Sequence, residues 1–506
     1  MMTKETLIFG PPGCGKTHTL IDIVRKHLDN NGTPEKVGFV SFSRKSVAEA
    51  KERVSKDLSA KQIPWFRTLH SIGYRWLGMK DENMLTRYDF NKLGSSLGVV
   101  FDNNTATNIN DGLISQSFKE GNRYLEIIGR AVMRKVSLEE QYNQVADHNL
   151  HWSLLKKIDQ QYKYFKQDNN KYDFTDMIEL FVKGGSSPEL NLLIVDEAQD
   201  LTPLQWDQVQ LMRDFSKEVW YAGDDDQCIH RWNGVQVGNF IEACKNRIVL
   251  GKSYRVPKLV HRMANRISSK ISYRQEKEWD STDIEGNIEY HMSWEEPDID
   301  QGSWTIMART NRLVSNIATR LRDDGYLFTR YGRPSISPDI LENMDIWKRL
   351  ILDEPINISD IRKLYNFVPK QGKRAMIKRG FAKQMQILED TLFFTFDELK
   401  SSYGLLAEKQ TDIYSVLNVT PDDREYMKSI ERRGEMFDKP RINISTIHAM
   451  KGGEDDNVIL LTESYPSAVT DEKQQDDEHR VFYTGVTRTR HNLHIIDTES
   501  KYKYEL

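Results

Sequence analysis

Short runs of β-branched and aromatic residues recur along the chain between longer segments with helical periodicity. Such alternation predicts parallel strands joined by helices, and therefore an α/β fold with doubly wound parallel sheets. The predicted strands are Leu7–Phe9, Val37–Phe42, Leu192–Val195, Val219–Ala222, Arg247–Leu250, Thr305–Ala308, Ile442–Ser445, Val458–Leu461 and Leu493–Ile496.

Two regions lack such runs, residues of about 80–172 and 351–437, and both are rich in Lys, Glu, Gln and Tyr. We expect them to be mainly helical insertions into two α/β domains. Within the second region, residues 361–388 contain eight basic residues and no Asp or Glu. This stretch predicts either a surface that follows a phosphate backbone or an ordinary solvated helix face.

Composition narrows the class of protein. The chain has 506 residues, of which 38% are hydrophobic and 29% charged, so it can form sizeable cores and is not a disordered chain. No apolar run approaches the ~18 residues needed to cross a bilayer, so we expect no membrane association. Three cysteines predict no disulfide framework and fit a reducing, cytoplasmic setting. The formal net charge of −4 neither indicates nor excludes nucleic-acid binding, which depends on local patches.

A glycine-rich loop follows the first predicted strand and precedes a helical pattern. In this context, glycines allow backbone N–H groups to surround phosphate oxygens, and the helix N-terminus favours negative charge. Lys16 would neutralise the β- and γ-phosphates, and Thr17 would bind Mg²⁺. The loop predicts a nucleotide site formed by Gly10, Pro11, Pro12, Gly13, Cys14, Gly15, Lys16 and Thr17.

An acidic pair, Asp196 and Glu197, follows the strand Leu192–Val195. This places two carboxylates at the C-terminal edge of a parallel sheet, where α/β folds bind ligands. Asp196 suits the coordination shell of Mg²⁺, and Glu197 suits a base for an attacking water. Together with Lys16, the pair predicts a nucleotide hydrolase.

Further polar and aromatic segments follow in order: Ser41–Ser46, Thr68–Ser71, Gly223–Gly234, Ser253–Arg255, Ala308–Asn311, Ser445–Glu454 and Tyr483–Arg488. With the loop and the acidic pair, they resemble the motifs of superfamily 1 DNA helicases of the UvrD/Rep/PcrA group, from residue 7 to residue 496. The resemblance implies two RecA-like motor domains, with ATP between them and single-stranded DNA across them. The domains would be 1A (1–79 and 173–246), insertion 1B (80–172), 2A (247–350 and 438–506) and a shortened insertion 2B (351–437).

The resemblance also implies roles at the nucleotide. Arg255 and Arg488 match arginine fingers, Gln227 matches a γ-phosphate sensor, and Tyr254 matches an aromatic that stacks on adenine. Glu454 matches a position near the nucleotide, as does Lys451. The implied ligands are ATP and Mg²⁺.

On the DNA side, Phe42 and Trp232 match base-stacking positions, and His70 matches a strand-contacting histidine. The same resemblance places His230, Thr446 and His448 on this side. Stacking suits a motor that must accept every sequence, because each base has a π-face. The expected partners are single-stranded DNA, junctions between duplex and single strand, and replication or repair proteins.

The chain also departs from the family. Nine residues precede Gly10, too few for the usual glutamine-containing motif, and His230, Asn233 and Gly453 replace a usual tyrosine, arginine and leucine. The leading hypothesis is an ATP-dependent helicase that translocates 3′ to 5′. The alternatives are a translocase that removes proteins from single strands, and a nucleotide-gated DNA-binding recombination mediator with little turnover.

Overall fold

The structure is a computed structural model that describes residues 3–54, 61–101, 120–145, 149–437 and 439–506. The chain divides into two compact units. Unit 1 comprises Met1–Tyr290, Ile447–Glu454 and Thr462–Leu506, and unit 2 comprises His291–Thr446 and Asp455–Leu461. The four-part division into 1A, 1B, 2A and 2B stays a prediction.

Unit 1 contains a six-stranded sheet in the order β3-β2-β4-β5-β1-β6. Every neighbouring pair is parallel, which confirms the predicted doubly wound α/β class. The strands are β1 (Lys4–Phe9), β2 (Val37–Ser41), β3 (Trp65–Thr68), β4 (Leu190–Asp196), β5 (Ser216–Gly223) and β6 (Arg247–Val249).

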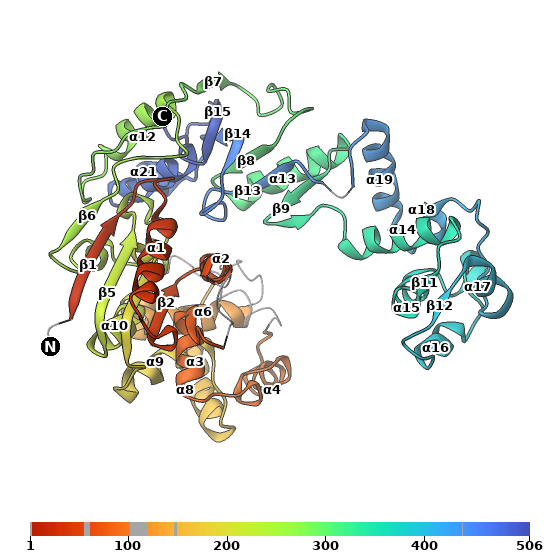
Figure 1. The fold of residues 1–506 in the computed structure, drawn as a ribbon, viewed down its shortest axis with the longest axis horizontal. Coiled ribbons are helices and arrows are strands. Elements are labelled where there is room, and N and C mark those ends of the chain that lie inside the picture. Colours follow the sequence, from red (N-terminus) through yellow and green to blue (C-terminus); the bar gives the residue numbers. More distant parts are fainter. Residues whose placement is uncertain (1–2, 55–60, 102–119, 146–148, 438) are drawn as a thin grey trace. The chain divides into compact units, whose positions relative to one another are not determined.

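Helices cover both faces of this sheet because successive strand residues point to opposite sides. Leu192 and Ile194 of β4 pack with α1 (Lys16–Asp29) and α2 (Arg44–Val54). Leu193 and Val195 pack in the opposite core, which is covered by α3 (Leu69–Trp76), α9 (Phe174–Gly184), α10 (Pro203–Asp214) and α11 (Val237–Ile241). Figure 1 shows α1 lying against this sheet.

The first insertion is helical over its described residues, as predicted. It contains α4 (Arg87–Leu97), α6 (Glu120–Arg134), α7 (Leu138–Asn143) and α8 (Trp152–Asp168) around a core of its own. Residues 102–119 and 146–148 of this predicted insertion lie outside the described part of the chain. The remaining elements of unit 1 include α12 (Lys258–Ser268), α20 (Pro466–Thr470), α21 (Glu472–Val486) and β15 (Thr489–Ile496). Strand β7 (Asn287–His291) lies where unit 1 passes into unit 2.

Unit 2 has a second sheet, in which β14, β8, β13 and β9 are parallel neighbours and β10 pairs antiparallel with β9. These strands are β8 (Trp304–Ala308), β9 (Phe328–Arg330), β10 (Arg333–Pro334), β13 (Ile442–Thr446) and β14 (Asp455–Leu461), with α13 (Asn311–Asp323) following β8. The predicted strands at 305–308, 442–445 and 458–461 are therefore confirmed.

The second predicted insertion is mainly helical. Its helices are α15 (Ile358–Phe367), α16 (Phe381–Gln386), α17 (Phe396–Ser402), α18 (Ile413–Val416) and α19 (Pro421–Arg433), preceded by α14 (Pro338–Ile351). It also contains an antiparallel pair of two-residue strands, β11 (Ile356–Asn357) and β12 (Phe393–Phe394), which the sequence patterns did not predict. Figure 1 shows α15, α16 and α17 gathered around this pair.

Candidate active site

The predicted phosphate loop connects β1 to α1 and curls around its own lysine. Gly13 and Gly15 have φ values of 72° and 77°, a backbone region that favours glycine. A Cβ atom on Gly10 would lie 2.1 Å from Lys16 Cγ, so the loop closes on the lysine stem. Lys16 Nζ donates a hydrogen bond of 2.7 Å to the Gly10 carbonyl oxygen. The loop therefore has the tight turn and the inward-facing lysine that a phosphate site requires.

The charge of Lys16 is held by surrounding acids. Burial lowers the pKa of Lys16, but nearby Cys14, Glu197 and Asp224 together raise the pKa above its ordinary value. Lys16 therefore stays positively charged beside the loop, ready to compensate a phosphate.

Asp196 is the last residue of β4, and Glu197 directly follows it with a φ of 52°. Asp196 Oδ1 accepts a hydrogen bond of 3.0 Å from the Glu197 backbone N–H. Asp196 Oδ2 is buried and accepts no hydrogen bond from the described residues. Burial, reinforced by Glu197, raises the pKa of Asp196 to about 7. An unsatisfied carboxylate oxygen at this place fits a cation ligand.

Glu197 is kept ionised. Burial raises its pKa, but Lys16 and Lys451 outweigh that effect and lower the pKa below its ordinary value. Gln199 Nε2 also donates to Glu197 Oε2 over 2.6 Å, which favours the charged form. The two neighbouring carboxylates therefore have opposite pKa shifts.

Gln227 connects two predicted motifs. Its Nε2 donates to Asp224 Oδ2 over 2.7 Å, and its Oε1 accepts from Arg488 Nη2 over 2.7 Å. Lys451 Nζ donates to the Gln227 carbonyl oxygen over 2.7 Å and forms an ion pair with Asp200. The structure thus brings Gln227 together with Arg488 and Lys451, which lie 261 and 224 positions after it in the sequence.

Arg488 is only 2% exposed. Besides Gln227, its guanidinium donates to the carbonyl oxygens of Thr484 and Gly453, at 2.9 and 3.2 Å. Burial, followed by the like charge of Arg255, lowers the pKa of Arg488 to about 9. Among the described residues its hydrogen-bond partners are neutral oxygens, so a phosphate would supply the charge compensation that the guanidinium lacks.

The segment Ser253–Arg255 lies directly on the phosphate loop. Ser253 Oγ donates to the Pro12 carbonyl oxygen over 2.7 Å, and the Tyr254 N–H donates to the Gly13 carbonyl oxygen over 2.9 Å. A Cβ atom on Gly13 would lie 2.4 Å from Arg255 Cβ. Tyr254 is 75% exposed, which leaves its ring accessible for stacking.

Arg255 and Glu454, both predicted to lie near the nucleotide, form an ion pair. Glu454 also pairs with Arg490, a residue that the sequence analysis did not identify. Burial raises the pKa of Glu454, but Arg255 and Arg490 lower it overall, so the carboxylate is ionised.

A buried charge cluster was also missed. The Lys277 side chain is 0% exposed and pairs with Asp224, Asp225 and Asp226 at 3.1, 2.5 and 2.9 Å. Arg274 adds an ion pair of 2.6 Å to Asp226. Three successive acids beside a predicted strand end are a signal for basic partners, but nothing in the sequence pattern selects Lys277 from the other lysines.

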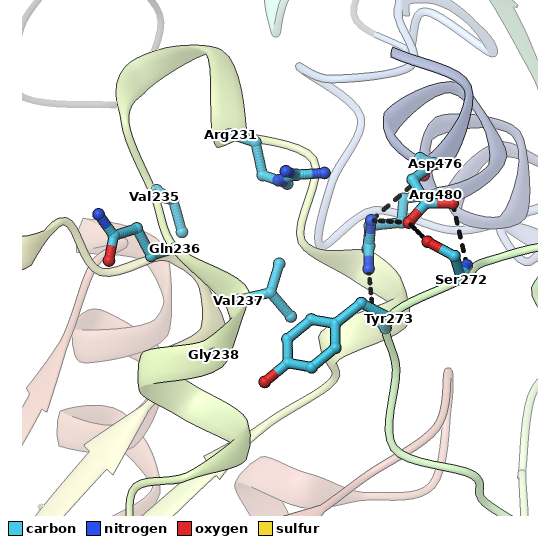
Figure 2. Close-up of a pocket in the computed structure, with 9 residues that line it drawn as sticks. All are labelled: Arg231, Val235, Gln236, Val237, Gly238, Ser272, Tyr273, Asp476 and Arg480. Atoms are coloured by element: carbon cyan, nitrogen blue, oxygen red, sulfur yellow. Dashed lines mark hydrogen bonds and ion pairs between the residues drawn. The ribbon is translucent and has the colours of Figure 1, made fainter. Parts of the chain in front are cut away.

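A pocket of about 380 Å³ lies beside this cluster (Figure 2). Arg480 of α21, 1% exposed, donates to the carbonyl oxygens of Tyr273 and Asp225 at 2.6 and 3.1 Å. Figure 2 also shows Asp476 accepting hydrogen bonds from Ser272, whose Oγ lies at 2.6 Å. The helix that leads to Arg488 is therefore bound to the turn that leads to Gln227.

Four predicted DNA-contacting residues form one aromatic group, which we call the aromatic row: Phe42, His230, Trp232 and His448. His230 is at its centre, with ring centroids 5.8 Å from Phe42, 6.2 Å from Trp232 and 6.2 Å from His448. Trp232 is 42% exposed. The guanidinium of Arg130, from insertion helix α6, lies 5.2 Å from the Trp232 ring centroid.

The other two predicted DNA contacts lie elsewhere. The ring neighbour of His70 is Phe174, with centroids 6.3 Å apart. Thr446 ends β13 in unit 2 and is 9% exposed. Their predicted roles stay predictions.

The basic stretch 361–388 is not one helix face. It runs through α15, the turn Gly372–Arg374 and α16. Arg362 pairs with Asp390, and Lys363 pairs with Glu342 and Asp360. The side chains that remain exposed to solvent include Lys370, Lys373, Arg374, Lys378, Arg379 and Lys383.

Within the described ranges, no helix combines the length and apolar character required to cross a membrane.

Two family models match the chain. The UvrD/REP helicase N-terminal domain matches residues 1–247, and the UvrD-like helicase C-terminal domain matches residues 381–500. Together they cover most of the chain and include both the phosphate loop and Arg488.

Two curated relatives match nearly the whole chain, and a third matches part of it. A probable DNA helicase II homolog of Mycoplasma pneumoniae is 22% identical over 97% of this chain and 81% of its own length. The ATP-dependent DNA helicase PcrA of Bacillus subtilis is 21% identical over 98% of this chain and 81% of its own. The ATP-dependent DNA helicase Rep of Buchnera aphidicola is 23% identical over 58% of this chain and 45% of its own. The chain belongs to the UvrD/Rep family of DNA helicases.

Proposed function

We propose that this ATP-dependent DNA helicase hydrolyses ATP at the Gly10–Thr17 loop and uses the energy to move 3′ to 5′ along single-stranded DNA and separate duplexes. The observation that carries the proposal is the short segment from Asp224 to Trp232. At one end, Gln227 joins Asp224 to Arg488. At the other end, His230 and Trp232 belong to the aromatic row. A movement of Gln227 caused by the γ-phosphate would therefore be passed along this short backbone segment to Trp232 on the proposed DNA surface.

The loop and the acidic pair fit a magnesium–nucleotide complex. Lys16 would neutralise phosphate charge, and the backbone N–H groups of the loop would bind phosphate oxygens. Thr17 and Asp196 would hold Mg²⁺, and the unsatisfied Asp196 Oδ2 supports this assignment. When bound, Mg²⁺ neutralises charge on the phosphates. Its positive charge would keep Asp196 ionised despite burial.

Glu197 would act as the general base. It is ionised, lies next to the proposed metal ligand and is oriented by Gln199. A carboxylate in this place can accept a proton from the water that attacks the γ-phosphate. The water's proton goes to Glu197, and the bond to the leaving ADP oxygen breaks.

Arg255 and Arg488 would stabilise the negative charge that spreads over the transferred phosphoryl group. Arg255 is held beside the loop through its neighbours Ser253 and Tyr254. Arg488 donates a hydrogen bond to the Gln227 side chain. Tyr254 would stack on the adenine, because its ring is exposed next to the loop.

On the DNA side, Phe42, Trp232 and His448 would contact bases around the buried His230. Such contacts tolerate any sequence because every base can stack. His70 and Thr446 would contribute further contacts to the strand, and a junction between single strand and duplex is the proposed substrate.

The test is ATP hydrolysis by Glu197→Gln with and without poly-dT. We expect kcat to fall by about 10²-fold or more because the water loses its base, while binding of ATP and DNA is retained. The variant keeps the phosphate loop, Gln227 and Arg488, so nucleotide binding is the control. Turnover near that of the wild type would place the base elsewhere.

A further inference from the structure

Glu454 is held by two arginines, one on each carboxylate oxygen. Arg255 donates through Nε and Nη2 to Oε2, and Arg490 donates through Nε and Nη2 to Oε1. The side chains of Arg255, Glu454 and Arg490 are 17%, 31% and 47% exposed. Arg490 belongs to β15, two residues after Arg488. The arrangement gives one carboxylate two alternative counter-charges.

The two arginines differ in what else they must do. The backbone of Arg255 is fixed on the phosphate loop: its Cβ lies 2.4 Å from where a Gly13 Cβ would be, and its N–H donates to Ser253 Oγ over 3.2 Å. Its guanidinium, however, is engaged by Glu454. It can approach a phosphate only by turning away from that carboxylate.

The free-energy cost of this rotation depends on whether a positive charge remains beside Glu454. A partly buried carboxylate that loses its only counter-charge is strongly disfavoured, whereas one that keeps a second arginine is not. Arg490 is placed to be that second arginine, because it binds the oxygen that Arg255 does not use.

We infer that Arg490 is a positioning residue for ATP hydrolysis, which retains Glu454 when the Arg255 guanidinium turns to the phosphates. The inference rests on the proposed role of Arg255. In this role Arg490 does not touch the nucleotide or the attacking water and acts through Glu454.

The experiment compares Arg490→Ala in two backgrounds, wild type and Glu454→Gln, by steady-state ATP hydrolysis and by binding of a fluorescent ATP analogue. In the wild-type background we expect kcat to fall about fivefold, in line with the coupling of partly exposed ion pairs, with nucleotide affinity unchanged within about twofold. In the Glu454→Gln background there is no carboxylate for Arg490 to retain, so we expect Arg490→Ala to have no further effect. Arg490→Lys, which keeps the charge, should restore most of kcat.

The matched control is Arg262→Ala on α12, which breaks an exposed ion pair with Glu285 and is not a partner of Glu454. It should leave kcat unchanged, and thermal melting should show all variants folded. The inference is wrong if Arg490→Ala leaves kcat unchanged, lowers it equally in both backgrounds, or weakens nucleotide binding instead. Arg255→Ala distinguishes failure of the inference about Arg490 from failure of the proposed role of Arg255. Turnover equal to that of the wild type in this variant would refute the proposed role of Arg255 itself. A loss there without a loss in Arg490→Ala would refute only the inference.

Discussion

At the scale of single residues, burial decides the charge of the histidines near the proposed DNA surface. Burial, followed by the positive charge of Lys451, lowers the pKa of His230 to about 3. Burial and Arg44 lower the pKa of His70 to about 4. Both rings are therefore neutral at physiological pH and would contact DNA by stacking or hydrogen bonding rather than as cations.

The depressed pKa of His230 predicts a pH-dependent stability. Below pH 6.5 the unfolded chain binds a proton at this histidine and the folded chain does not, so the free energy of unfolding falls as pH falls and is unaffected by His230 above about pH 7.5. His230→Phe removes this contribution and keeps an aromatic ring. We expect its unfolding free energy to fall less steeply than that of the wild type between pH 6.5 and 5, by up to about 1.4 kcal/mol per pH unit. Urea unfolding at several pH values measures the difference, and equal slopes would contradict the assigned pKa.

Trp232 is the residue whose substitution tests the proposed DNA surface. Trp232→Ala should weaken binding of single-stranded DNA by about 1–3 kcal/mol, because a stacking surface is lost. ATP binding at Lys16 should not change. Trp76→Ala is the matched control, because Trp76 is 37% exposed, packs against Trp65 and is not part of the aromatic row. Fluorescence anisotropy with oligo-dT measures both. Equal affinity of Trp232→Ala and wild type would make Trp232 a packing residue.

At the scale of elements, the turn after β5 depends on Lys277. Removing one member of a buried ion cluster leaves the others uncompensated, so Lys277→Met should lower the free energy of unfolding by about 3–5 kcal/mol. A second substitution, Asp225→Asn, should recover part of that loss, because it replaces one of the carboxylates left without Lys277 by a neutral amide. Urea unfolding measures both, with Lys217→Met, at an exposed position near the start of β5, as control. A loss below about 1 kcal/mol in Lys277→Met would show that the cluster does not stabilise the turn.

The same elements show what the sequence can predict. All nine predicted strands are present, and most of them are the buried strands that continuous apolar runs bounded by polar turns predict, whereas β6 is an exposed edge strand. Strand β3 was missed, since it is only four residues long and contains Arg67. The phosphate loop and the acidic pair are local motifs, and their geometry follows from neighbours in the sequence.

Arg490 and Lys277 were not predicted for a different reason. Their partners, Glu454 and Asp224 to Asp226, are tens of residues away, and the contacts arise only when the chain folds. The family resemblance identifies residues that contact ligands. It does not identify the residues that hold those ligand-contacting residues in position. The aromatic row shows the converse case: its four members come from three distant segments, and the resemblance rather than any periodicity grouped them.

At the scale of the whole molecule, one parallel and one mainly parallel sheet with helical insertions agree with a member of the UvrD/Rep family. The proposed ATP-site residues and the aromatic row are joined in unit 1 by one short turn, stabilised by Lys277 and Arg480. ATP hydrolysis and DNA binding should therefore change together. Variants in that turn should uncouple the two rather than abolish folding.

The most direct test of this account is strand displacement on duplexes that carry a single-stranded 3′ tail or 5′ tail, measured together with ATP hydrolysis. We expect ATP-dependent separation of the 3′-tailed duplex only, no separation with a non-hydrolysable ATP analogue, and loss of both activities in Glu197→Gln. DNA-stimulated hydrolysis without separation of either duplex would contradict a helicase and favour a translocase. DNA binding with no DNA-stimulated hydrolysis would contradict a motor altogether.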